Sequence, residues 1–133
     1  MSKLILILYK GLILKIFHIL FPLISSFSAF AVEFSDISGT YSVTTDYAPI
    51  VNIIEISPDG RVELTEKSPF GELTCSGYAV IQQNVLVSNV VCLNGSTFTQ
   101  TVDFSNVLNF DDFSAPVYSS LYGNELFMNF KRE

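Results

Sequence analysis

Two short turn signals divide residues 72–104 into three runs rich in Val, Ile, Thr and Tyr, and this pattern constrains the fold more than any other feature of the chain. The runs are Glu72–Gln82, Val85–Leu93 and Ser96–Phe104, and they are separated by Gln83-Asn84 and Asn94-Gly95. This spacing is typical of consecutive antiparallel hairpins. The stretch is therefore predicted to be a three-stranded meander.

The two cysteines fix the register of this meander. If Gln83-Asn84 is a two-residue loop, counting outward from it places Cys75 directly opposite Cys92, at a non-hydrogen-bonded site with a Cα separation of about 4.5 Å. We expect a disulfide there, which stabilises the fold by about 3 kcal/mol. Because each residue of a central strand bonds to one neighbouring strand only, both turns cannot be strict two-residue loops. Leu93-Asn94-Gly95 is therefore predicted to be a three-residue loop with Gly95 at positive φ.

This register sorts the meander onto two faces. The face predicted to be core includes Ser88 and Gln100 opposite each other, either bonded to each other or to a buried water, or serving as the polar anchors of a ligand cavity. The other face is polar on the third strand but has an apolar group that needs a cover, from the C-terminal segment or from a partner. Internal cover is the preferred interpretation. The group comprises Tyr78, Val80, Val85, Val87 and Val91.

Residues 1–31 are predicted to be a secretory signal peptide. Three lysines precede an uncharged run, and Ala29-Phe30-Ala31 supplies the small-x-small pattern for cleavage near Ala31. The early lysines argue against a full transmembrane span, with an uncleaved anchor as the alternative. We therefore expect a secreted or periplasmic protein in which residues 32–133 form a single β domain, without a stable membrane span after cleavage.

Charge and residue chemistry narrow the function. Cleavage leaves four basic and thirteen acidic residues, a net charge of −9, so nothing supplies a basic patch for nucleic acid. Two cysteines suit an oxidising compartment. The only histidine, His18, leaves with the signal peptide, which removes the usual general base and any histidine-based zinc site. The pair Asp111-Asp112 is interpreted as solvated, because calcium needs six or more oxygens. We expect no metal, no cofactor and no enzymatic activity.

The rest of the chain extends the β pattern. The sequence leaves the structure of Ser105–Gly123 open: Asn106–Phe113 is compatible with a short helix that Pro116 ends, and Val117–Tyr122 with a strand or a turn. Seven or eight short strands indicate an all-β fold, a small antiparallel meander barrel or, alternatively, a two-layer β-sandwich. The further predicted strands are Gly39–Thr45, Ile50–Ile56, Arg61–Glu66 and Asn124–Arg132.

The start of the first strand, Gly39-Thr40-Tyr41, resembles the Gly-x-Trp start of lipocalin-like (calycin) barrels, with Tyr where Trp is usual. The overall meander topology is similar as well. The resemblance implies that a basic residue of the last strand, Lys131 or Arg132, packs across Tyr41. It also implies a carrier for a small apolar ligand.

Alternate turns of a meander share an end, which brings Asp46–Pro49, Lys67–Gly71 and Asn94-Gly95 together with Tyr47 and Phe70 as aromatic tips. Because large aromatic side chains are normally buried, the preferred expectation is that either ring folds back to plug the barrel mouth. If the tips are exposed, they suit recognition of a partner. The preferred function is binding of a protein partner through this rim or the valine face, as an inhibitor or adaptor does. The alternative is a lipocalin-like carrier of a small apolar ligand, held by Ser88 and Gln100.

Overall fold

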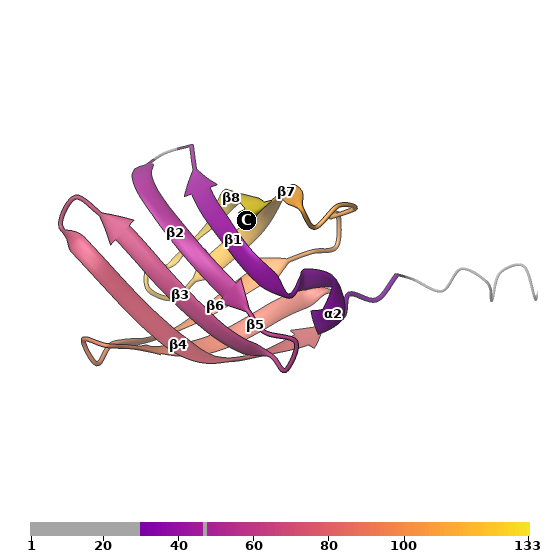
Figure 1. The fold of residues 1–133 in the computed structure, drawn as a ribbon, viewed down its shortest axis with the longest axis horizontal. Helices are drawn as coiled ribbons and strands as arrows, with labels where there is room; N and C mark the ends of the chain where they lie inside the picture. The colour runs from indigo at the N-terminus through magenta and orange to yellow at the C-terminus, as the bar shows by residue number, and fades with distance from the viewer. Residues whose placement is uncertain (1–29, 47) are drawn as a thin grey trace, which may run out of the picture. The chain divides into compact units, whose positions relative to one another are not determined.

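Eight antiparallel strands follow one another around a closed barrel, and the first strand pairs with the last (Figure 1). The computed structural model describes residues 30–46 and 48–133, so the predicted signal peptide lies almost wholly outside the described residues. The fold is the predicted meander barrel and not the two-layer sandwich. Its elements are α2 (Phe34–Ile37), β1 (Gly39–Thr45), β2 (Ala48–Ile56), β3 (Arg61–Ser68), β4 (Gly71–Gln82), β5 (Val85–Cys92), β6 (Thr97–Asp103), β7 (Asp112–Ser119) and β8 (Asn124–Arg132).

The central meander has the predicted register. Cys75 of β4 pairs with Cys92 of β5, and a disulfide joins them with their Cα atoms 3.8 Å apart, closer than the expected separation. Gln83 and Asn84 have φ values of 50° and 64°, as a two-residue turn of type I′ requires. Gly95 has a φ of 84° in the three-residue loop that follows β5. The disulfide and both turns are thus confirmed.

A short helix covers one end of the barrel. The side chain of Asp36 accepts a hydrogen bond from the backbone N–H of Glu33, and Ile37 is buried in the core. Before the helix, the N–H of Val32 donates to Oδ1 of Asn84 in the β4–β5 turn (2.9 Å). Figure 1 shows α2 at the opposite end from the β3–β4 turn. We call the far end, with the β1–β2, β3–β4, β5–β6 and β7–β8 turns, the open end.

Arg132 of β8 packs across Tyr41 of β1 where the barrel closes. Its guanidinium carbon lies 5.3 Å from the centre of the Tyr41 ring, and its Nη2 donates to Tyr41 Oη (2.6 Å) and to the carbonyl oxygen of Asp36 (2.7 Å). Nη1 forms an ion pair with Asp111 (2.9 Å). Burial raises the pKa of the Tyr41 hydroxyl, while the hydrogen bond from Arg132 opposes the rise. This is the arrangement that the lipocalin resemblance implied, with Arg132 rather than Lys131 in the role.

The sequence leaves the segment between β6 and β7 open, and the structure excludes the short helix with which it was compatible. Residues 106–111 form turns instead of a helix, and Pro116 lies inside a strand. Only three residue pairs join β6 to β7, and Pro116 lies just outside that short ladder, where a missing N–H breaks little pairing. Phe104, Phe110 and Phe113 form an edge-to-face cluster with ring centres 5.7–6.0 Å apart. This cluster packs the connection against the core of the barrel.

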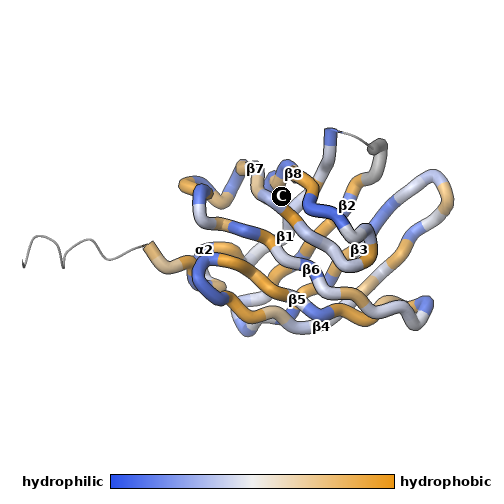
Figure 2. The backbone as a smooth tube through the Cα atoms, turned by 180° about the vertical axis from the view of Figure 1, so that it is seen from behind, coloured by the Kyte–Doolittle hydropathy of each residue, from blue (hydrophilic) through white to orange (hydrophobic). Residues whose placement is uncertain are grey.

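The outer face of β4 and β5 has no cover within residues 30–46 and 48–133. Tyr78, Val80 and Val91 are 67%, 53% and 58% exposed. Figure 2 shows β5 as hydrophobic along most of its length, which agrees with apolar residues on both of its faces. Internal cover by the C-terminal segment was the preferred prediction, and it is wrong because that segment becomes β8 and closes the barrel.

Candidate functional site

A small cavity lies inside the barrel at the open end. It offers ≈ 20 Å³ to the centre of a water-sized sphere, about the room that one water molecule needs. Apolar side chains make up most of its wall. Five polar residues also line it, namely Asn52, Glu66, Gln100, Ser119 and Tyr122.

Strand alternation explains why polar residues reach this position. Ile54 on β2 and Leu64 on β3 are paired and buried, and the next inward positions toward the open end are Asn52 and Glu66, which also pair. Asn52 and Glu66 are not among the site residues that the sequence predicts. Extending the same two-residue period would have predicted both polar residues inside the barrel.

The acceptor oxygen of Asn52 stands out in this cavity. Its Oδ1 is buried and has no hydrogen-bond partner among the residues that the structure describes. A buried acceptor without a donor costs about 1–3 kcal/mol. The site is therefore suited to a donor N–H or O–H, whether from water or from a ligand.

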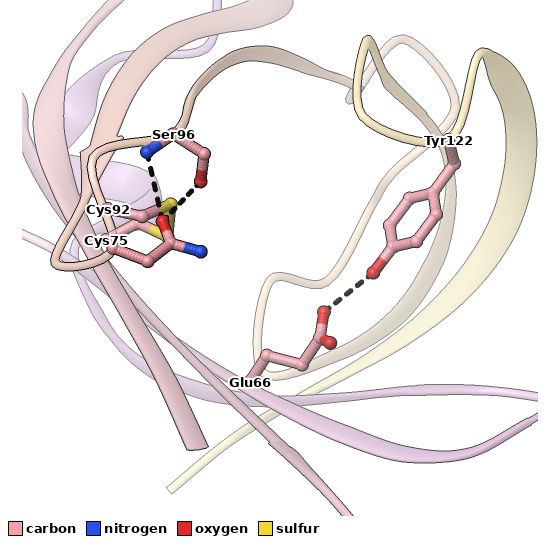
Figure 3. Close-up of a disulfide and its surroundings, with 6 residues drawn as sticks. Glu66, Cys75, Cys92, Ser96 and Tyr122 are labelled. Carbon is pink, nitrogen blue, oxygen red and sulfur yellow. Dashed lines mark hydrogen bonds between the residues drawn. A yellow bond between two sulfur atoms is a disulfide. The ribbon is translucent and has the colours of Figure 1, made fainter. Parts of the chain in front are cut away.

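A hydrogen bond links Tyr122 and Glu66 at the mouth of the cavity. Tyr122 comes from the β7–β8 turn, and its hydroxyl donates to Oε2 of Glu66 on β3 (2.7 Å), as Figure 3 shows beside the disulfide of β4 and β5. Burial and the bond to the carboxylate together raise the pKa of Tyr122 to about 12. This link connects strands that are not neighbours in the sheet.

Ser88 and Gln100, the predicted polar pair, have different roles in the structure. Ser88 and Gln100 are cross-strand partners and both are buried. Oγ of Ser88 donates to the backbone carbonyl of Gln100 (3.4 Å), which accounts for Ser88 structurally. Gln100 lines the cavity, whereas Ser88 does not.

The rim of the open end carries exposed apolar side chains. Phe70 is 99% exposed at the tip of the β3–β4 turn, so the expectation that its ring folds back to plug the barrel is wrong. Its backbone N–H donates to Oγ of Ser68 (3.2 Å), which orders the tip. Leu93 and Leu121, on the β5–β6 and β7–β8 turns, are also exposed. Tyr47 lies outside the described residues. Sequence reasoning missed the two leucines, although the three-residue loop already placed Leu93 at this end.

The acidic pair Asp111-Asp112 lies at the other end of the barrel, on the side of α2. Asp111 is the ion-pair partner of Arg132, and its neighbour Asp112 is exposed in β7. Within residues 30–46 and 48–133, no His, Cys, Asp and Glu side chains gather in a group that could hold a metal ion. No helix in that part of the chain is both long and apolar enough to cross a membrane.

Comparison of the chain with protein-family models and with curated proteins finds no match.

Proposed function

We propose that this protein is an exported binding protein that holds a protein partner at the rim of its open end. The observation that carries the proposal is the exposure of Phe70 (99%) and Leu93 (87%) on turns that the barrel brings to the same end. Exposed apolar side chains on ordered turns are the anchors that partner-binding surfaces use. With Leu121 they form what we call the rim.

The size of the interior favours a protein partner over a small apolar ligand. Pockets that bury a small molecule measure about 300–1,000 Å³. The ≈ 20 Å³ at the open end is far below that range. This argues against a ligand inside the barrel, and we therefore propose that the binding surface lies on the outside, where the rim is already in place without rearrangement.

Export is part of the same proposal. The signal-like residues 1–31 and the buried Cys75–Cys92 disulfide both suit an oxidising compartment outside the cytoplasm. Mass spectrometry of unreduced protein recovered from that compartment should give a chain that begins near Val32 and lacks free thiols. A full-length mass with two free thiols would contradict export.

The rim can be tested against a matched control at the other end. Leu108 in the β6–β7 connection is as exposed as Phe70, at 99%, but lies on the side of α2. A photo-crosslinking residue in place of Phe70 should capture a defined partner from the extracytoplasmic fraction. The Leu93→Ser variant should lose that product, and the Leu108→Ser variant should keep it. Equal loss, or equal retention, in the two variants would refute the rim.

A lipocalin-like carrier is the second candidate, because the orphan Oδ1 of Asn52 and the inward amide residue Gln100 suit a ligand with a donor group. The Tyr122–Glu66 bond would have to open for such a ligand to enter. A fluorescent fatty alcohol, whose hydroxyl can donate to Oδ1 of Asn52, should then bind the Tyr122→Phe variant more tightly than the wild type. Absence of binding to either protein rejects the carrier.

We further propose that the protein acts by binding alone and catalyses no reaction. Asp111 and Asp112 are the acidic pair that would be the first choice for a hydrolase. Asp111 forms an ion pair with Arg132 at the α2 end of the barrel, so the two carboxylates do not form a common site. A hydrolytic activity that disappears in an Asp111→Asn variant with unchanged stability would contradict this part of the proposal.

A further inference from the structure

A continuous uncharged area lies on the outer face of three neighbouring strands, β4, β5 and β6, with Glu72 of β4 and Asp103 of β6 on the same face at its edges. Strand pairing places its residues in continuous rows across the three strands. We call this surface the sheet face. Its outward residues are Tyr78, Val80, Val85, Val87, Asn89, Val91, Thr97, Thr99 and Thr101.

The borders of the sheet face carry charges of both signs. Arg61 of β3 pairs with Tyr78 at one border, with the carboxylate of Glu63 beside it on the same strand. Asp103 of β6 pairs with Val85 at the diagonally opposite border. Hydrogen bonds from Ser105 lower the pKa of Asp103, so it is ionised at neutral pH. The uncharged area therefore lies between Arg61 and Glu63, which have opposite charges, on one side and the anionic Asp103 on the other.

The polar groups in the middle of the sheet face are compatible with burial. Oγ1 of Thr99 donates to Oδ1 of Asn89 across β5 and β6 (2.7 Å). This internal bond reduces the cost of removing water, because buried polar groups are tolerated when they are hydrogen-bonded. Small β-branched side chains around them give a surface of the kind that packs against another sheet.

We propose that the sheet face binds a second copy of this chain across a two-fold axis that passes near the Val80–Val87 pair. The chain has thirteen acidic and seven basic residues, so two copies repel each other over most of their surfaces but not across an uncharged face. This axis lies in the interface and is perpendicular to the line from Arg61 to Asp103. Rotation by 180° about it exchanges the positions of these two residues. Each Arg61 then meets the other copy's Asp103, as a self-complementary two-fold interface requires.

This association is independent of partner binding at the rim. The sheet face lies on the side of the barrel and the rim at its end, so a dimer presents two rims at once. Linked binding sites raise the overall affinity for a partner that carries two epitopes, without any new contact.

The test is sedimentation equilibrium of the processed, unreduced protein over a wide concentration range. We expect a concentration-dependent mass that reaches twice that of the single chain. Val80→Glu should raise the dimer dissociation constant at least about tenfold, because two buried like charges then face each other near the axis. Phe127→Glu, at a 60% exposed position on β8, is the matched control and should change nothing.

Charge reversal supplies the second arm, at the exposed Arg61 and the half-buried Asp103. Because the side chain of Asp103 also accepts a hydrogen bond from the N–H of Ser105, thermal unfolding of each variant checks that it is folded. Arg61→Asp alone should weaken the dimer, and Arg61→Asp combined with Asp103→Arg should restore it. A single-chain mass at every concentration overturns the proposal, and so does a dimer that Phe127→Glu disrupts as strongly as Val80→Glu. Failure of the double reversal to restore association refutes the proposed axis.

Discussion

The hydroxyl of Tyr41 is the point where three parts of the chain are joined, and its removal should be costly. Oη donates to the backbone carbonyl of Ile37 (3.0 Å) and accepts from Nε (3.2 Å) and Nη2 (2.6 Å) of Arg132. The ring itself is 1% exposed and contacts Phe113 and Phe130 edge to face. A Tyr41→Phe substitution keeps this packing, so it measures the polar contribution alone.

The magnitude follows from the groups left behind. The carbonyl of Ile37 loses a donor in a buried position, and such a loss costs about 1–3 kcal/mol. Arg132 loses an acceptor for two N–H groups, but its side chain is 30% exposed and water can replace part of that bonding. We therefore expect the free energy of unfolding to fall by about 2–3 kcal/mol, a large share of the about 5–15 kcal/mol typical of a domain.

Urea unfolding with the disulfide intact is the appropriate assay. The midpoint should fall while the slope with denaturant stays constant, since the same surface is exposed on unfolding. The melting temperature should drop by about 10–20 °C for a domain of this size. An Arg132→Met variant provides the second side of a double-mutant cycle, in which the Tyr41–Arg132 coupling should be about 1–2 kcal/mol. A loss below about 0.5 kcal/mol for Tyr41→Phe, or strict additivity with Arg132→Met, would refute the reasoning.

Three further predictions follow from the same geometry. Replacing both disulfide cysteines with alanine should lower the free energy of unfolding by about 3 kcal/mol in urea titrations, and an unchanged midpoint would show that the crosslink constrains nothing. Gly77→Ala should cost about 3 kcal/mol, because the added methyl group would overlap the backbone carbonyl of Asn89, whereas Ser76→Ala on the exposed side should have little effect on the melting temperature. The pKa of Tyr122 is raised to about 12, above the value near 10 of an unfolded tyrosine. The contribution of this residue to the free energy of unfolding is therefore complete below about pH 10 and is lost as the pH rises toward 12. Absorbance titration should show the Tyr122 pKa falling in a Glu66→Gln variant, and an unchanged titration would rule out the bond.

The parts of the fold that the sequence predicts are those with local constraints. Turn chemistry at Gln83-Asn84 and Gly95, together with the position of the two cysteines, determines the register of β4, β5 and β6, and that register places Gln100 inside the barrel. The position of Arg132 over Tyr41 could be foreseen only through a family resemblance, because the two residues come from opposite ends of the domain. The strand at Pro116 could not be foreseen. Proline argues against a central strand, and only the short β6–β7 ladder makes it tolerable here.

The exposed sheet face has a cause that strand alternation alone does not reveal. Alternation tells which residues of β5 face outward, but whether they are covered depends on how much chain remains once the barrel is complete. Here eight strands and one short helix use the chain from Phe34 to Arg132, and β8 must pair with both β7 and β1 to remove the free edges of the sheet. Because β8 closes the barrel, this C-terminal segment does not cover Val80 and Val91. Among the residues that the structure describes, barrel closure leaves none to cover the apolar residues outside β4 and β5, and this is why we propose that two copies associate through that face.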